Sequence, residues 1–82
     1  MLDIEYKENF LKTIRKIKEL AFKERIKKRV EDIINNPEIG KPMRFARKGT
    51  REVYVGSYRL AYAYIKEENT ILFIDIYHKD EQ

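Results

Sequence analysis

Residues 51–78 read REVYVGSYRLAYAYIKEENTILFIDIYH, and this stretch decides the fold. Large side chains alternate with small or polar ones over most of it, which is the period of a β-strand whose two faces meet different surroundings. Gly56-Ser57 and Glu67-Glu68-Asn69 interrupt the alternation with residues typical of turns. The last segment is apolar on both faces, so we expect it to lie inside the sheet. The pattern predicts three successive antiparallel strands, over 51–55, 58–65 and 70–77.

The sequence before this stretch predicts one strand and two helices. Residues 2–6, LDIEY, alternate between apolar and acidic side chains, which indicates a half-buried strand. From Lys7 the apolar residues recur at helical spacing, in two stripes on opposite sides of one helical wheel. A single straight helix would expose one stripe, so we expect a helical hairpin with a break near residues 20–23. The stripes comprise Phe10, Ile14, Ile17, Leu20 and Ala21, then Phe22, Ile26, Val30 and Ile33.

Asn35-Asn36-Pro37 ends the second predicted helix, because the residue before a proline avoids the α region. A further short edge piece is expected over Met43–Ala46. The predicted order is therefore an N-terminal strand, a two-helix hairpin and an antiparallel β-meander. This is an α+β fold in which the helices pack on one small sheet. With only 82 residues, we expect a single domain spanning residues 1–82.

The composition excludes several classes of protein. The chain contains no cysteine and a single histidine, which rules out disulfide frameworks, cysteine-ligated zinc and multi-histidine metal sites. We therefore expect no metal site and no cofactor. The sequence has neither an apolar run long enough to cross a bilayer nor a basic N-terminus followed by an apolar stretch. We expect a cytoplasmic protein with no membrane partner.

Positive charge is concentrated in the first part of the chain. The net charge is +4, but residues 1–50 carry 14 bases and 8 acids, whereas residues 51–82 carry 4 bases and 6 acids. Residues 41–51 contain five bases and no acid in a stretch cut by glycine and proline. Such a loop either binds a polyanion such as RNA or keeps the protein soluble. The candidate RNA-binding residues are Lys41, Arg44, Arg47, Lys48 and Arg51.

Arg59 is the most informative candidate for chemistry. It falls inside the strand predicted at 58–65, on a face otherwise lined by two alanines and an isoleucine. A guanidinium there is costly unless an anion meets it. Two interpretations stay open: an ion pair with Glu52 or Asp75 across the sheet, or a bidentate clamp on a phosphate group.

His78 and Lys79 follow the last predicted strand. Histidine exchanges protons near neutral pH, although a lone histidine near a chain end is more often simply exposed. The sequence holds no nucleophilic triad, no phosphate-binding glycine loop and no carboxylate cluster for magnesium. RNA cleavage needs none of these, because the 2′-hydroxyl of RNA can attack the adjacent phosphate if the protein supplies cations and a route for two protons. Arg59, His78, Lys79 and the basic loop have suitable chemistry.

Taken in order, these segments resemble the RelE/ParE superfamily of toxins from bacterial and archaeal toxin–antitoxin pairs, and archaeal RelE-type mRNA interferases most closely. The similarity covers nearly the whole chain. It is carried by NPEIGKPM (36–43), VGSYRLAY (55–62) and IDIYHK (74–79). It implies a microbial-RNase-like sheet crossed by two helices. It also implies a ribosome-dependent, metal-independent endoribonuclease that cleaves mRNA in the ribosomal A site and inhibits translation, with a RelB-like antitoxin as its protein partner.

The same resemblance implies catalytic roles for three residues. Arg59 matches the arginine of the family that contacts the scissile phosphate. His78 matches the histidine of the family, and Lys79 stands where many members have arginine.

Two departures from the family pattern keep other functions open. Residues 80–82 contain no counterpart of the tyrosine that many RelE-type enzymes place there, and Lys79 replaces a bidentate arginine with a point charge. Glu52 and Tyr54 also occupy positions where some relatives carry bases. The alternatives are a ParE-like inhibitor of DNA gyrase and a non-catalytic RNA-binding member.

Overall fold

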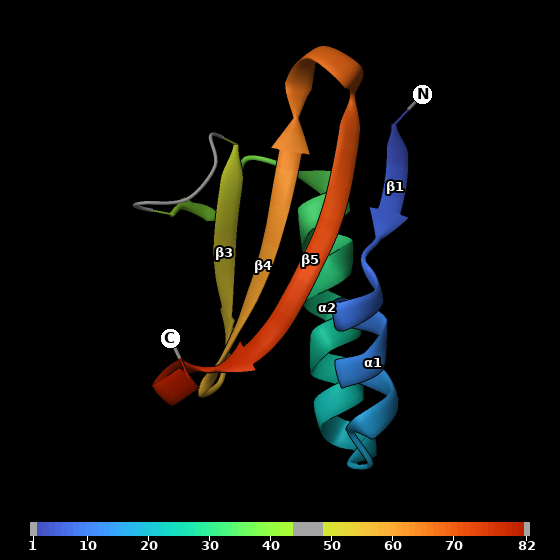
Figure 1. Ribbon diagram of the computed structural model, residues 1–82, viewed down its shortest axis with the longest axis vertical. Helices are drawn as coiled ribbons and strands as arrows, with labels where there is room; N and C mark the ends of the chain where they lie inside the picture. The colour runs from blue at the N-terminus through green and yellow to red at the C-terminus, as the bar shows by residue number, and fades with distance from the viewer. Residues whose placement is uncertain (1, 44–48, 82) are drawn as a thin grey trace.

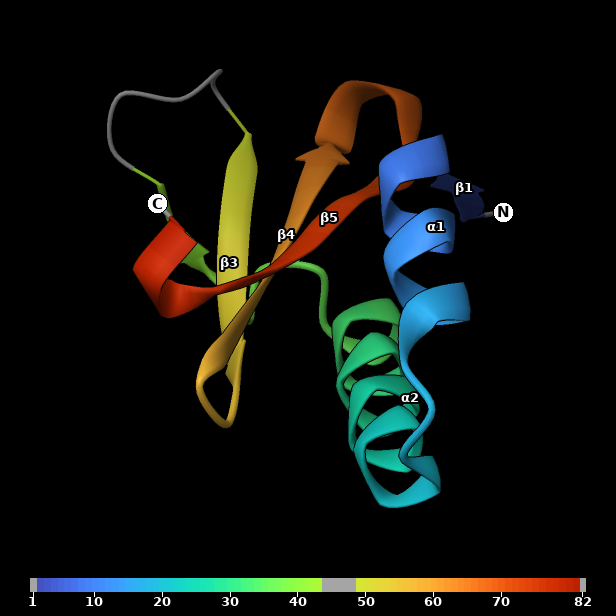
Figure 2. The same ribbon diagram turned by 60° about the horizontal axis from the view of Figure 1, so that its bottom comes forward.

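The computed structural model describes residues 2–43 and 49–81 of the chain. An N-terminal strand is followed by two helices and then by the remaining strands, as the sequence pattern predicts (Figure 1). Both helices lie on the same side of the sheet, where their buried side chains join one core (Figure 2). The elements are β1 (Asp3–Tyr6), α1 (Glu8–Lys16), α2 (Leu20–Asn35), β2 (Lys41–Pro42), β3 (Thr50–Val55), β4 (Tyr58–Ile65) and β5 (Thr70–His78), with single 3₁₀ turns η1 (Lys66–Glu68) and η2 (Lys79–Glu81).

The strands form one mixed sheet in the order β1-β5-β4-β3-β2. β1 pairs with β5 in parallel, and the other neighbours are antiparallel. A parallel pair needs a long crossover connection, which the two helices and the meander supply. The expected α+β architecture is confirmed, and so is the internal position of the last strand, because β5 lies between β1 and β4.

The helix-covered face of the sheet carries the large apolar side chains. Tyr62 on β4 lies opposite Phe73 on β5, and both are fully buried. Phe10 of α1 packs its ring 5.5 Å from that of Phe73, measured between centroids. Ile26 and Ile33 of α2 complete the same core. Burial of these side chains is the main source of stability for so small a fold.

β5 contains one extra residue relative to β4. Its register passes from Ala61 opposite Asp75 to Tyr62 opposite Phe73, so Ile74 has no partner. Such a bulge exchanges the two faces of a strand, because side chains alternate with a period of two. The helix-covered face therefore carries the odd-numbered residues of β5 before the bulge and the even-numbered residues after it. The sequence pattern, apolar at both parities, did not reveal this exchange.

The break between the helices differs from the predicted position. α1 ends at Lys16 and α2 begins at Leu20, so the connection is residues 17–19 and not 20–23. Ile17 leaves the helix with extended backbone, at φ −77° and ψ 123°. Leu20 is 76% exposed and is not part of the inward stripe to which the pattern assigned it. Phe22 therefore lies in the first turn of α2, where its ring packs 4.9 Å from that of Tyr58, measured between centroids.

The edge of the sheet also differs from expectation. Among the described residues the edge strand is β2, at Lys41–Pro42, just before the piece expected at Met43–Ala46. Met43 follows β2 and donates its backbone N–H to the carbonyl of Thr50 at 3.0 Å. Residues 44–46 of the predicted piece lie outside the described residues. Within the described ranges, neither helix combines the length and the hydropathy of a membrane span.

Candidate active site

The sheet face that the helices leave uncovered carries Arg59 and Lys41 among the candidate residues, and we call it the open face. Arg59 on β4 lies opposite Tyr54 on β3 and Tyr77 on β5, so the three side chains stand in one row across the sheet. In the next row, Ala61 lies between Glu52 and Asp75. These two rows bring together a cation, two phenol rings and two carboxylates.

Arg59 stacks on an aromatic ring. Its guanidinium carbon lies 3.8 Å from the ring centre of Tyr54, a cation–π contact, and its Nη1 donates to the carbonyl of Tyr58 at 3.3 Å. In the part of the chain that the structure describes, no ion pair joins Arg59 to Glu52 or Asp75. Stacking uses the flat face of a guanidinium and leaves donors along its edge. The arrangement thus suits an anion that approaches Arg59 edge-on.

The two carboxylates of the open face are held by other groups. Tyr77 donates its hydroxyl hydrogen to Oε2 of Glu52 at 3.1 Å. Oδ1 of Asp75 accepts the backbone N–H of Ile76 at 2.8 Å. The sequence suggests Glu52 and Asp75 as ion-pair partners of Arg59, and it gives no sign of the contact between Glu52 and Tyr77. The bulge at Ile74 explains the omission, because it moves Tyr77 to the open face.

His78 lies on the opposite face from Arg59. It pairs with Tyr58 across the strands, and the two rings meet edge-to-face at 5.2 Å. Its Nδ1 accepts the backbone N–H of Asp80 at 3.2 Å. Arg59 and His78, which the sequence analysis groups as candidates for the same chemistry, therefore lie on different faces of the sheet. Without the bulge in β5, their side chains would share a face.

Lys79 begins the turn η2 and is exposed. Its backbone N–H donates to the carbonyl of Ser57 at 2.9 Å, which ties the end of β5 to the β3–β4 turn. Gly56 in that turn has a φ of +61°, a conformation that glycine adopts without strain. The contact fixes the backbone of Lys79 at the end of the sheet and leaves its ammonium free to meet solvent or an anion.

The five candidate RNA-binding residues do not behave alike. Lys41 is exposed and lies opposite Glu52, on the open face. Arg51 lies opposite Tyr62, on the helix-covered face, and donates to the carbonyls of Glu38 at 3.1 Å and Gly40 at 2.7 Å. Arg44, Arg47 and Lys48 fall outside the described residues. Of the described pair, Lys41 is placed to meet a ligand, and Arg51 supports the segment before β2.

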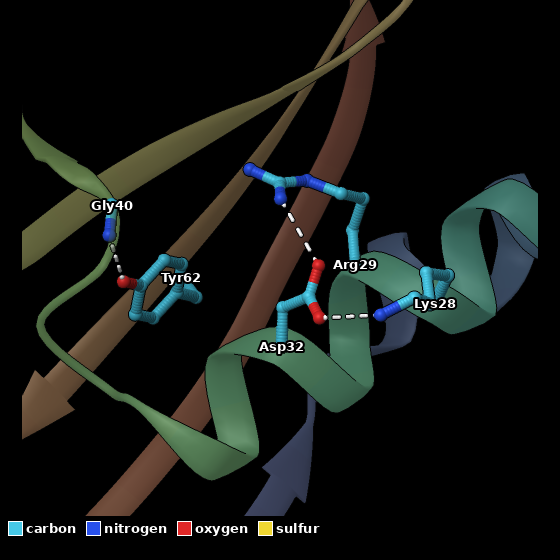
Figure 3. A network of polar contacts seen from close by, with 5 residues as sticks. All are labelled: Lys28, Arg29, Asp32, Gly40 and Tyr62. Atoms are coloured by element: carbon cyan, nitrogen blue, oxygen red, sulfur yellow. Dashed lines mark hydrogen bonds and ion pairs between the residues drawn. The ribbon is translucent and has the colours of Figure 1, made fainter.

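Tyr62 also fixes the segment before β2, which contains Pro37 and Gly40 (Figure 3). Its hydroxyl accepts the N–H of Gly40 at 2.8 Å and donates to the carbonyl of Pro37 at 2.8 Å. Burial raises the pKa of Tyr62 above its usual value, so it remains a neutral donor. A Cβ at position 40 would lie 2.6 Å from the Tyr62 oxygen, which explains glycine there. These contacts set where Lys41 enters the sheet.

A separate network neutralises part of the charge on α2 (Figure 3). Asp32 accepts hydrogen bonds from Lys28 at 3.0 Å and from Arg29 at 3.1 Å. The hydrogen bond from Lys28 contributes most to lowering the pKa of Asp32. Two cations of the basic helix thus serve local pairing, in agreement with a charged helix surface.

The comparison with protein families gives one match. The family model described as ParE toxin of type II toxin–antitoxin system, parDE, matches residues 4–82. A comparison with the sequences of curated proteins finds no significant match.

Several solved toxin–antitoxin structures contain similar chains. A chain of the intact E. coli RelBE complex has 24% identity and a TM-score of 0.80, with 95% of this chain and 96% of that chain covered. A chain of the archaeal RelE–RelB complex from Pyrococcus horikoshii OT3 has 13% identity and a TM-score of 0.77, with 99% of this chain and 98% of that chain covered. A chain of the E. coli DinJ–YafQ complex has 21% identity and a TM-score of 0.78, with 99% of this chain and 97% of that chain covered. At these identities the similarity establishes the shared fold.

The family match and the shared fold agree with the segments that carry the resemblance in the sequence, and the expected RelE/ParE relationship is confirmed. Because the match spans nearly the whole chain, this chain belongs to the ParE toxin family and is a toxin of a type II toxin–antitoxin system.

Proposed function

We propose that this toxin is a ribosome-dependent endoribonuclease that acts in the cytoplasm, cleaves mRNA in the ribosomal A site and so inhibits translation. The position of Arg59 carries the proposal. Its guanidinium is stacked on Tyr54, is not paired with a carboxylate among the described residues, and offers its edge donors on the open face. Preorganised donors of this kind stabilise the charge that develops on a phosphate during transesterification.

Protein side chains alone carry the chemistry in this proposal. Residues 2–43 and 49–81 contain no group of three His, Cys, Asp or Glu side chains placed to hold a metal ion. The nucleophile is the 2′-hydroxyl of the mRNA, which attacks the adjacent phosphate. Arg59 contacts that phosphate, and positive charge comes from two exposed lysines, Lys41 on the open face and Lys79 at the end of the sheet. His78 stays a predicted participant, although it lies across the sheet from Arg59.

The shape of the open face supports dependence on the ribosome. Arg59 and its neighbours stand on a sheet surface, and Tyr54 beside them is 53% exposed. Such a surface gives little binding energy for holding a flexible RNA strand in an attack geometry. A ribosome that already holds the mRNA would supply this positioning, which contributes a large part of the rate in reactions between held groups.

An antitoxin of the RelB type is the proposed protein partner. RelB and DinJ are named as partners in the solved complexes that this chain resembles. An apolar groove of about 350 Å³ between α1 and α2 suits one amphipathic segment of such a partner. Its lining holds two lysines and one glutamate, and this net positive charge favours acidic residues flanking the apolar ones. The groove is lined by Tyr6, Phe10, Leu11, Ile14, Lys23, Ile26, Lys27, Val30 and Glu31.

The proposal is tested on ribosomes programmed with a defined mRNA. The antitoxin-free protein should produce new mRNA 5′ ends at the A-site codon, detected by primer extension. Arg59→Ala should abolish them, and Arg15→Ala should not. Arg15 is the matched control, because it loses the same charge from an exposed ion pair with Glu8 on α1. A wild-type protein that leaves the mRNA intact would overturn the proposal.

Inhibition of DNA gyrase is the second candidate function. The family that matches is the one named for ParE, and Glu52 and Tyr54 stand where some RNA-cleaving relatives carry bases. A supercoiling assay with purified gyrase separates the two functions. Loss of supercoiling together with intact mRNA on ribosomes would favour this candidate.

A further inference from the structure

We infer that Glu52 is the general base of the proposed ribonuclease and that Tyr77 positions it, an inference that rests on the proposed function. Metal-independent cleavage of RNA requires a group that removes the 2′-hydroxyl proton. The open face offers two carboxylates near Arg59, at positions 52 and 75. The contacts of these two carboxylates distinguish them.

Glu52 has the right spacing from the phosphate site. Arg59 lies directly opposite Tyr54, and Glu52 precedes Tyr54 by two residues on the same face of β3. Diagonal neighbours of this kind in an antiparallel pair are separated by about 7–8 Å, which long side chains bridge. A phosphate bound at the edge of Arg59 would therefore place its adjoining ribose within reach of the Glu52 carboxylate.

Tyr77 holds one oxygen of Glu52 and leaves the other available. The hydroxyl of Tyr77 donates to Oε2 at 3.1 Å, and within the described chain Oε1 accepts no hydrogen bond. Because Tyr77 fixes the carboxylate, the second oxygen keeps a defined direction. A base that removes the proton of a hydroxyl group requires such a defined direction. Asp75 differs in its partner, because its Oδ1 accepts the backbone N–H of the next residue, Ile76, at 2.8 Å, whereas Glu52 is held by a side chain from another strand.

The chemical step is balanced with these groups and water. Glu52 takes the proton of the 2′-hydroxyl while the 2′-oxygen forms a bond to phosphorus. The bond from phosphorus to the 5′-oxygen breaks, and the leaving 5′-oxygen takes a proton from water. The products are a 2′,3′-cyclic phosphate and a 5′-hydroxyl end. Glu52 then passes its proton to the hydroxide that remains, and Arg59 neutralises the charge on the phosphate throughout.

Whether Glu52→Gln raises or lowers the cleavage rate shows if Glu52 acts as a general base or only as a negative charge near the phosphate. A carboxylate beside a bound phosphate repels it, so removal of the charge alone should strengthen binding and speed cleavage. Removal of a general base should slow cleavage, by about 10²–10⁴-fold. Glutamine keeps the size of the side chain and an oxygen that can accept from Tyr77.

The experiment measures single-turnover cleavage on programmed ribosomes across the acidic and neutral pH range. For the wild type, the rate should rise with pH and level off once the base is ionised. Glu52→Gln should be slower by at least about 100-fold and should lose that rise. Glu67→Gln, an exposed change on η1, is the matched control and should behave like the wild type.

Tyr77→Phe tests the positioning role separately. It removes the hydroxyl and keeps the ring beside Arg59, so cleavage should slow while the dependence of the rate on pH remains. Glu52→Asp, which retains a carboxylate on a shorter stem, should keep the same dependence at an intermediate rate. This variant also guards against a Glu52→Gln protein that fails to fold.

The ribonuclease function and the role of Glu52 as its general base are overturned by different results. Wild-type cleavage together with a Glu52→Gln variant as fast as the wild type, or faster, would overturn the role of Glu52 and leave the ribonuclease function intact. An mRNA with a 2′-deoxynucleotide at the cleavage position should resist the wild type. Absence of wild-type cleavage would overturn the function and the inference together.

Discussion

The hydroxyl of Tyr62 and the backbone N–H of Gly40 meet at 2.8 Å, although 21 residues separate them in the chain. Tyr62 is fully buried in the core, and Gly40 stands just before the edge strand β2. The same hydroxyl donates to the carbonyl of Pro37. One side chain of the core thus satisfies two backbone groups of an irregular segment and fixes the entry of Lys41 to the open face.

Tyr62→Phe should destabilise the fold without disturbing its packing. The phenyl ring fills the same space, but a buried N–H and a carbonyl lose their partner, which costs about 1–3 kcal/mol. For a domain of this size, each kcal/mol lowers Tm by roughly 4–8 °C. Thermal unfolding measures the change. Tyr6→Phe, on a ring that is 45% exposed, is the control. Equal stability of the two variants would contradict a structural role for the Tyr62 hydroxyl.

Gly40→Ala should damage the same contact from the other side. The added Cβ would lie 2.6 Å from the Tyr62 oxygen and 2.7 Å from its Cε1, so the ring or the segment must move, at a cost of about 1–3 kcal/mol. Because both changes break one interaction, the double variant with Tyr62→Phe should cost less than the two single effects added together. Denaturant unfolding of all four proteins gives the coupling energy. Strict additivity would mean that the two residues act independently.

The sequence predicts the meander and the helices well because their signals are local. The alternation in 58–65 sets both the strand and its two faces, and Gly56-Ser57 marks the turn before it. The break between the helices lies three residues before the position that the spacing predicts, and no glycine or proline marks it. Phe22, near the start of α2, packs on Tyr58, a tertiary contact that local spacing does not encode.

The candidate site was predictable only in part, and for the same reason. Arg59 stood out because a guanidinium in a row of small side chains is unusual within a strand. The exchange of faces at Ile74 is invisible where both faces of the strand are apolar, and it separates His78 from Arg59 while it brings Tyr77 beside Arg59. Arg51 looked like a free base, but folding brings the carbonyl of Gly40 to it. Chain folding, and not composition, decides which bases remain available.

Asp32 should make the stability of the protein depend on pH in the acidic range. Its hydrogen bonds with Lys28 and Arg29 lower its pKa below the ordinary value of 3.8. A carboxyl group whose pKa is lower in the folded state stabilises the fold above its unfolded pKa and loses that contribution as the pH falls through the folded value. Asp32→Asn should therefore be less stable than the wild type near neutral pH and equally stable well below pH 3.8. Urea unfolding at both extremes tests this. A difference that persists in acid would mean that charge is not the cause.

The contact of Arg59 with Tyr54 should matter for cleavage through the ring and not through the phenol hydroxyl. Tyr54→Phe keeps the aromatic face that lies 3.8 Å from the guanidinium carbon, and should cleave mRNA on ribosomes at the wild-type rate. Tyr54→Leu removes the cation–π contact, which is worth about 0.5–1 kcal/mol at an exposed site, and should slow cleavage about 2–5-fold. Arg59→Lys should slow it further, because an ammonium is a point charge without the paired donors of a guanidinium edge.

Single-turnover rates for these three variants rank the contributions of ring, hydroxyl and guanidinium edge. Because Tyr54 is an exposed side chain on β3, we expect its replacement by leucine to leave Tm within a few degrees of the wild type. A slow Tyr54→Phe protein would instead assign the phenol hydroxyl a part in proton transfer. An Arg59→Lys protein as fast as the wild type would show that positive charge alone suffices at this position, and that edge-on recognition of the phosphate is wrong.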